Sequence, residues 1–281
     1  MNRRSFLHSA AGVAPAALIT PVVAQTVTRK GRLKQGATRG CFGRGKTMEE
    51  VCAVAARLGL KGIDLVGPAD WPMLKKYGLQ STMCPGGGKL SENMNHKENH
   101  AVLEPQYREA IERAAAFGAP NVIALSGNKR GITDEEGMDN TVAFLNKIKP
   151  LAEDKGITIC MELLNSKVDH KDYQCDRTWW GVEVVKRVNS PRVKLLYDIY
   201  HMQIMEGDII RTIRNNIQYI GHFHTAGNPG RHELDSTQEL NYKAIAQAIV
   251  DLGFTGYFSH EYSPVGDPLA GLELAISTCD V

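Results

Sequence analysis

Residues 193–203 read Val-Lys-Leu-Leu-Tyr-Asp-Ile-Tyr-His-Met-Gln, a short apolar run that ends at Asp198 and is followed by His201. The length and mostly apolar content of this run are typical of a strand that is buried on both faces, as the strands of a parallel sheet are. Similar runs recur on both sides of it and alternate with longer amphipathic segments. This alternation predicts repeated strand and helix units that join into one parallel sheet.

Extended outward from residues 193–198, the pattern predicts eight strands and eight helices. The strands are 33–38, 61–66, 79–84, 121–126, 157–163, 193–198, 219–225 and 256–261. The helices are 48–58, 71–77, 104–117, 135–154, 179–188, 207–216, 242–252 and 268–277. We therefore predict an α/β fold with a single (β/α)8 TIM barrel, which needs about 250 residues. An open doubly wound sheet is the alternative, but residues 36–40 lack the G-x-G-x-x-G spacing of a dinucleotide site.

The first 24 residues resemble an export signal of the twin-arginine type. Arg3 and Arg4 precede an uncharged stretch over residues 9–24 that ends in the small-residue sequence Val-Val-Ala. Two prolines interrupt this stretch, which is also shorter than the roughly 20 apolar residues of a membrane span. We expect a signal over residues 1–24 and a barrel domain over residues 25–281. The protein would then be periplasmic or otherwise exported, with no membrane contact after signal removal.

The composition gives no sign of a nucleic-acid partner. Lys and Arg number 33 against 31 Asp and Glu, so the formal net charge is +2, which is too small for binding by bulk electrostatic attraction. The six cysteines contain no C-x-x-C pair, which argues against a structural zinc knuckle or a redox dithiol. The composition leaves the oligomeric state open, a homo-oligomer included.

Polar side chains stand at the ends of four consecutive predicted strands: Glu162, Asp198, His224 and Glu261. In a barrel, the carboxyl ends of the strands form the face that carries the active site. Each residue alone also has an ordinary structural explanation, as a helix cap, a core histidine or an ion-pair partner. Together, three converging carboxylates would repel one another unless a cation held them. We therefore predict one divalent cation bound by these four side chains, and this donor set suits Mn²⁺, Mg²⁺ or Co²⁺.

Two further polar segments are expected to form loops. Residues 84–88 read Cys-Pro-Gly-Gly-Gly and lack the Lys-Ser/Thr ending of a phosphate loop, so we expect a mobile loop over the site. Residues 96–100 carry two histidines four positions apart, but not in the H-E-x-x-H order of zinc proteases. We expect a solvated loop there.

Five parts of the chain carry a resemblance to a known family. They are Asn-Val-Ile-Ala-Leu-Ser-Gly-Asn (121–128), Tyr-Asp-Ile-Tyr-His-Met-Gln (197–203), Gly-His-Phe-His with Asn-Pro-Gly-Arg-His-Glu (221–224 and 228–233), Glu-Leu-Asn-Tyr (239–242) and His-Glu-Tyr (260–262). On these segments the chain resembles the xylose-isomerase-like barrel superfamily and, within it, the hydroxypyruvate isomerase family. The similarity runs over essentially the whole of residues 25–281.

This resemblance implies a role for each candidate residue. The four strand-end residues would bind the metal, and Glu162 and Glu261 would also transfer the proton. His201 would contact a substrate oxygen, and Arg231 would contact a substrate oxyanion. One position departs from the pattern, because hydroxypyruvate isomerases commonly carry Gln where this chain has His224, whereas the related ketose 3-epimerases carry His.

The expected reaction interconverts hydroxycarbonyl compounds through an enediolate, whose negative oxygen a divalent cation stabilises. Two substrate classes stay open. A hydroxy-keto acid such as hydroxypyruvate fits Arg231 as a carboxylate clamp, and an extracytoplasmic keto-sugar of the tagatose or psicose type fits His224. Two other functions are less favoured: a phosphodiesterase resembling endonuclease IV, which usually needs a His-richer multi-zinc cluster and a basic groove, and a non-catalytic sugar or metal binder.

Overall fold

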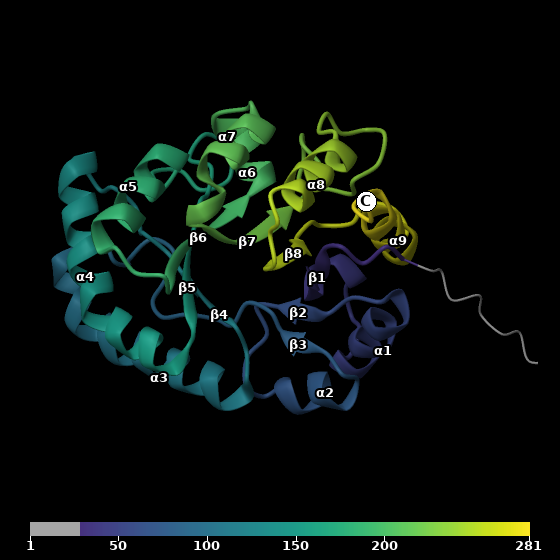
Figure 1. Ribbon diagram of the computed structural model, residues 1–281, viewed down its shortest axis with the longest axis horizontal. Helices are drawn as coiled ribbons and strands as arrows, with labels where there is room; N and C mark the ends of the chain where they lie inside the picture. Colours follow the sequence, from purple (N-terminus) through teal and green to yellow (C-terminus); the bar gives the residue numbers. More distant parts are fainter. Residues whose placement is uncertain (1–28) are drawn as a thin grey trace, which may run out of the picture.

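The computed structural model describes residues 29–281, which form an eight-stranded parallel sheet curled into a barrel with helices around it (Figure 1). The strand order is β3-β2-β1-β8-β7-β6-β5-β4. The strands are β1 (Lys34–Thr38), β2 (Gly62–Asp64), β3 (Gln80–Ser81), β4 (Asn121–Ala124), β5 (Thr158–Glu162), β6 (Val193–Asp198), β7 (Ile220–Thr225) and β8 (Tyr257–His260). The predicted (β/α)8 TIM barrel is confirmed.

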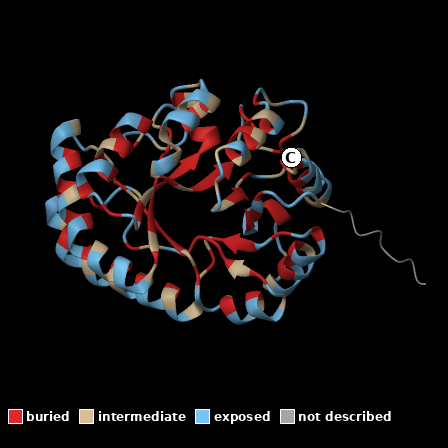
Figure 2. Ribbon diagram, in the orientation of Figure 1, coloured by how far each residue is buried: buried red, intermediate tan, exposed pale blue. Residues whose placement is uncertain are grey.

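The described α-helices are α1 (Met48–Leu58), α2 (Trp71–Lys76), α3 (His100–Phe117), α4 (Asp134–Lys155), α5 (Thr178–Val188), α6 (Ile199–Met205), α7 (Ile209–Asn216), α8 (Tyr242–Asp251) and α9 (Pro268–Thr278). Their outward faces are exposed, whereas the strands are buried (Figure 2). None of the helices within residues 29–281 is long and apolar enough to cross a membrane. The predicted signal over residues 1–24 lies outside the described residues and stays a prediction.

The barrel closes through a bridge made just beyond β3. The backbone N–H of Cys84 donates to the carbonyl of Asn121 at 2.9 Å, and the N–H of Ile123 donates to the carbonyl of Cys84 at 3.0 Å. These two bonds join the chain after β3 to β4, the other edge of the sheet. The C-terminal ends of all eight strands therefore meet around one rim.

Helix α6 was not predicted from the sequence. It has seven residues and begins directly after β6, where the Asp198 carboxylate accepts the backbone N–H of His201 at 3.1 Å. This N-terminal cap lets a helix start at the end of the strand. Two turns are too short to show a clear helical period in the sequence, so the segment read as part of a loop.

The expected solvated loop over residues 96–100 is wrong. His96 and His100 are buried, with 7% and 6% of their surfaces exposed. A ring nitrogen of each lies within hydrogen-bond distance of a backbone carbonyl, that of Asn128 at 3.1 Å and that of Met94 at 2.8 Å. Helix α3 begins at His100, four residues earlier than expected, because this ring packs on Phe144 of α4.

The glycine-rich segment 84–88 is packed into the wall of the barrel and is not a mobile loop over the site. A Cβ atom added at Gly86 would overlap the carbonyl oxygen of Ile123 and meet the Tyr107 ring at 3.0 Å. A Cβ atom added at Gly87 would come equally close to the Tyr107 ring. The glycines are therefore needed for close approach to β4 and α3, which allows the bridge that closes the barrel.

Gly86→Ala should lower the free energy of unfolding by about 1–3 kcal/mol, because the added methyl group overpacks a backbone contact that cannot yield like a side chain. Thermal or urea unfolding measures this change. Gly67→Ala is the matched control, since no atom lies within 4 Å of a Cβ added there. Equal stability of the two variants would contradict the role given to Gly86.

Candidate active site

The four strand-end residues predicted from the sequence come together at the rim of the barrel. Glu162 is the last residue of β5, Asp198 is the last of β6, His224 lies in β7, and Glu261 directly follows β8. One ligand atom from each of them lies within 4.8 Å of the others. The alignment of neighbouring strands explains this, because Asp198 pairs with His224, and the N–H of Glu261 donates to the carbonyl of Thr225 at 2.9 Å.

His224 lies at the centre of the group. Its Nδ1 atom is 3.1 Å from Oε2 of Glu261 and 3.4 Å from Oε1 of Glu162. Nδ1 of His224 and Oδ2 of Asp198 are both buried and make no hydrogen bond within residues 29–281. Buried polar atoms without partners are costly and rare. Three carboxylates and one imidazole lone pair that point to one place fit a divalent cation with oxygen and nitrogen ligands.

The three carboxylates of this group differ in how readily they ionise. Burial raises the pKa of Glu162, and it raises the pKa of Asp198 to about 6. Burial also acts to raise the pKa of Glu261, but the charges of His224 and Arg231 outweigh it and lower that pKa to about 2. The site therefore holds closely spaced carboxylates of which two resist ionisation, and added positive charge would stabilise them.

A fourth carboxylate, that of the buried Asp64 at the end of β2, orients His224. Its Oδ2 atom accepts the Nε2–H of His222 at 2.7 Å and that of His224 at 3.0 Å, and its Oδ1 atom accepts the Thr82 hydroxyl. Without a cation, burial acts to lower the pKa of His224, but the neighbouring carboxylates outweigh it and raise that pKa. In the neutral imidazole the contact with Asp64 keeps the proton on Nε2, so Nδ1 then has its lone pair toward the other carboxylates. Sequence reasoning missed Asp64, although an acidic residue inside the apolar run 61–66 was the same signal that singled out Glu162.

The two predicted substrate-binding residues lie beside this group. Arg231 donates from Nη2 to Oε2 of Glu261 at 2.7 Å, and the same nitrogen is 4.0 Å from Oδ2 of Asp198. Its guanidinium group lies 5.8 Å from the centre of the Tyr200 ring. His201 is fully buried, and its Nε2 atom is 3.7 Å from Oδ2 of Asp198. A ligand at the four strand-end residues would therefore meet both side chains.

The loop after β5 adds polar residues that sequence reasoning did not single out. Asn165 is fully buried, and its side-chain nitrogen lies 2.6 Å from Nδ1 of His201 and 2.6 Å from Oδ2 of Asp169. The same Asp169 oxygen accepts the Tyr200 hydroxyl at 2.9 Å. The only sequence signal was a polar residue three positions after Glu162, which a loop residue of no function would share.

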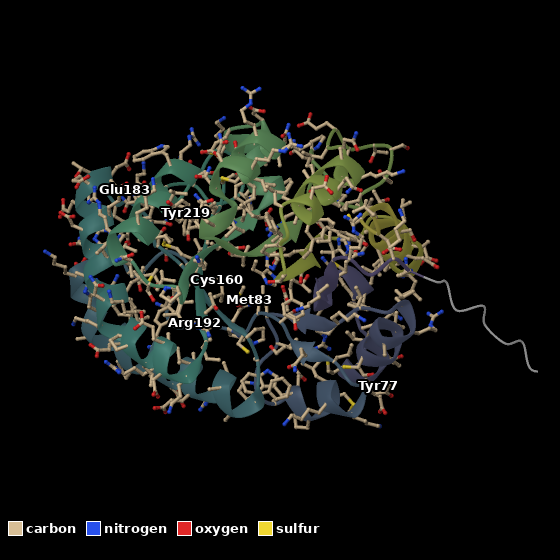
Figure 3. The ribbon with its side chains drawn as sticks, in the orientation of Figure 1. Tyr77, Met83, Cys160, Glu183, Arg192 and Tyr219 are labelled. Carbon is tan, nitrogen blue, oxygen red and sulfur yellow. The ribbon has the colours of Figure 1, made fainter. Side chains whose placement is uncertain are left out.

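An apolar layer fills the barrel beneath the polar group. Met83, Ile123, Cys160 and Leu196 form a buried cluster, of which Met83 and Cys160 are labelled near the barrel centre in Figure 3. Cys160 and Leu196 precede Glu162 and Asp198 by two positions on β5 and β6, so they point to the same face one layer lower. The polar group therefore rests on an apolar floor, which strengthens its electrostatic interactions.

Relatives of known sequence agree with this picture. A protein from Danio rerio, provisionally named a hydroxypyruvate isomerase, is 32% identical over 179 residues, which cover 60% of this chain and 65% of that protein. The chain thus spans just under two thirds of the length of that relative. The 2-oxo-tetronate isomerase of Haemophilus influenzae is 28% identical over 235 residues, which cover 78% of this chain and 89% of that protein.

Solved structures share the architecture. An AP endonuclease of family 2 from Brucella melitensis superposes with a TM-score of 0.76 at 25% identity, covering 85% of this chain and 96% of that one. The D-psicose 3-epimerase of Clostridium cellulolyticum H10, solved with D-tagatose, superposes with a TM-score of 0.75 over 89% of this chain and all of that one. Its identity is 18%, so this likeness shows the fold. The family model described as xylose isomerase-like TIM barrel matches residues 52–277, and the chain therefore belongs to the xylose isomerase-like TIM barrel family.

Proposed function

We propose that this protein is an isomerase that moves a proton between neighbouring carbons of a small hydroxycarbonyl compound, with one divalent cation held by Glu162, Asp198, His224 and Glu261. The observation that carries the proposal is the gathering of these side chains at the barrel rim, with two buried atoms that have no protein partner within residues 29–281. The isomerase names of two relatives support the same reaction type. Mn²⁺, Mg²⁺ and Co²⁺ are the cations that suit these ligands.

The cation would supply positive charge against the oxygens of the enediolate. The protein side chains supply the rest of the chemistry. Glu162 and Glu261 take the proton from one carbon and return it to the next one, or to the opposite face of the same carbon in an epimerase. The burial of Glu162 and the apolar floor restrict the access of water, which limits exchange of the proton with solvent.

Arg231 favours a hydroxy-keto acid as the substrate. A guanidinium group carries five N–H donors, and one of them is used on Glu261. The remaining donors suit two parallel hydrogen bonds to a substrate carboxylate. The proposal therefore places hydroxypyruvate and 2-oxo-tetronate first, and the name of the Haemophilus influenzae relative supports the second compound.

A ketose 3-epimerase is the second candidate function. The specific observation in its favour is His224, which matches the fourth ligand that the resemblance gives to these sugar enzymes. Export by the predicted signal over residues 1–24, which we retain as a proposal, would also favour a sugar outside the cytoplasm.

Proton exchange in D₂O tests the proposed function. The protein is loaded with Mn²⁺ and incubated separately with hydroxypyruvate, 2-oxo-tetronate, D-tagatose and D-psicose, and deuterium at the carbon next to the carbonyl is followed by NMR. Exchange with a keto acid, accompanied by the isomer in which the carbonyl and the neighbouring hydroxyl have changed places, supports the first candidate. Exchange with a ketose and formation of its 3-epimer supports the second candidate. Failure of all four compounds both to take up deuterium and to form an isomer or epimer would contradict both candidates.

Asp64→Asn should weaken binding of the cation by about 10-fold to 100-fold, because groups that orient a ligating histidine typically have effects of this size. An amide at position 64 presents a donor where His222, His224 and Thr82 all need an acceptor. Competition for Mn²⁺ with a fluorescent chelator measures the affinity. Asp251→Asn, which changes an exposed carboxylate on α8, is the control. Unchanged affinity in the Asp64 variant would remove this residue from the proposed site.

A further inference from the structure

The side chain of Asn165 has an orientation that the backbone around it determines. Its Oδ1 atom accepts the backbone N–H groups of Val168 at 3.0 Å and of Asp169 at 2.9 Å. Because both of these partners are donors, the atom that faces them must be the oxygen. The amide nitrogen of Asn165 therefore points the other way, toward the imidazole of His201.

The amide nitrogen has two N–H groups and two partners. One partner is Oδ2 of Asp169, which accepts at 2.6 Å and also accepts the Tyr200 hydroxyl at 2.9 Å. The other partner is Nδ1 of His201, also at 2.6 Å. Since the nitrogen of Asn165 can only donate, Nδ1 of His201 has to accept and carries no proton.

A neutral imidazole that accepts at Nδ1 carries its proton on Nε2. Nε2 of His201 is buried and makes no hydrogen bond in the described part of the chain. It lies 3.7 Å from Oδ2 of Asp198, which is too long for a hydrogen bond but places the N–H group beside the four strand-end residues. The rings of His170 and Tyr200 pack edge-on against the imidazole, at 5.2 and 5.1 Å, and help to hold its plane.

We infer that Asn165 is a positioning residue that makes His201 an N–H donor to the oxygen of the bound substrate. The inference rests on the proposed function for the identity of the acceptor. A nitrogen that carries a proton cannot ligate a cation or accept a proton, so His201 is neither a fifth ligand nor the base. The contrast with His224 is direct, because Asp64 takes its Nε2–H and leaves the Nδ1 lone pair for the cation. The two imidazoles thus present opposite groups to the same ligand.

Exchanging the two side chains at positions 165 and 169 reverses this hydrogen bond. In the double variant Asn165→Asp/Asp169→Asn the net charge is unchanged, the carboxylate at 165 still accepts the two backbone N–H groups, and the amide at 169 can donate to it. The contact to His201 reverses, since a carboxylate accepts. The contact with Tyr200 reverses as well, because an amide nitrogen takes the place of the Asp169 oxygen that accepts the Tyr200 hydroxyl. Asp169→Asn alone is the control, because the amide of Asn165 then still donates to His201.

The proton position is read by ¹H–¹⁵N correlation spectra of the histidine rings in ¹⁵N-labelled protein without metal or substrate, at about pH 8, where the imidazole is neutral. The His201→Gln variant assigns the signals. We expect the proton on Nε2 in the native protein and in Asp169→Asn, and on Nδ1 in the double variant. A proton on Nδ1 in the native protein, or on Nε2 in the double variant, would overturn the inference. If the double variant does not fold, Asn165→Ala replaces it in this test. This variant removes the donor without adding charge, so His201 should populate both tautomers.

Kinetics then separate this inference from the proposed function. With the substrate that shows exchange in D₂O, the double variant should lose about 10²-fold to 10³-fold in kcat, the usual effect of removing one donor to a developing oxyanion, with a smaller change in KM. A tautomer shift without any loss in kcat would show that Asn165 orients a group with no part in the reaction. The expected tautomer in a protein that exchanges no substrate would leave the hydrogen bond intact and contradict the proposed function instead.

Discussion

Glu261→Gln should reduce proton exchange by about 10²-fold to 10⁴-fold, the contribution that a general acid or base typically makes. The amide keeps the size of the side chain but cannot take a proton at neutral pH. The same loss is expected for Glu162→Gln, because in the proposed reaction one carboxylate removes the proton and the other returns it. Steady-state exchange of deuterium into the substrate that is active in the native protein measures the effect.

Two controls make this result specific to the chemistry. Glu273→Gln, an exposed residue on α9, should keep the native rate. Thermal unfolding of the Glu261 and Glu162 variants should show a folded barrel, and Mn²⁺ binding should be measured in each variant to separate lost proton transfer from lost cation. A Glu261→Gln enzyme that is fully active with bound Mn²⁺ would end the assignment of this residue as a proton carrier.

Removal of the divalent cation should abolish exchange and lower thermal stability together. A ligand present at 100 times its dissociation constant stabilises the folded state by about 2.7 kcal/mol. Treatment with a chelator should remove this contribution, because the buried carboxylates would lose the cation that binds them. Differential scanning calorimetry and the exchange assay, run before and after dialysis against a chelator, measure the two effects. Adding back Mn²⁺ or Mg²⁺ should restore both.

Asp198→Asn provides the matched variant for this experiment. This variant removes one carboxylate from the four proposed ligands. The side-chain oxygen of the new Asn can still cap α6 by accepting the N–H of His201. The variant should show little stabilisation by added Mn²⁺. Stabilisation equal to that of the native protein would mean that the cation binds elsewhere, and unchanged activity after complete chelation would contradict a metal-dependent reaction.

The barrel and the group at its rim could be predicted from the sequence for one physical reason. Parallel strands bring their carboxyl ends to the same rim, so residues far apart in the chain become neighbours as soon as the strands are recognised. Glu162 and Glu261 needed no knowledge of packing to be placed together. Their role as ligands was predicted from the convergence of the carboxylates and their role as proton carriers from a resemblance, and both stay predictions.

Residues that act through other side chains could not be found in this way. Asp64 reaches His222 and His224 across the barrel, over 158 and 160 residues of sequence, and only the closed sheet places them in contact. Asn165 depends on the path of the loop after β5, which no periodic pattern describes. The burial of His96 and His100 depends on the packing of α3 on α4, so a polar composition wrongly indicated a solvated loop.

The apolar layer of Met83, Ile123, Cys160 and Leu196 also determines how molecules travel through the protein. Side chains occupy the barrel on that side, so under the proposed function reactant and product would both use the opposite side, at the rim. The same layer would separate a proton held by Glu162 from the solvent at the far end of the barrel. If Glu162 and Glu261 carry the proton as we propose, part of the label on a reactant should therefore survive conversion into product.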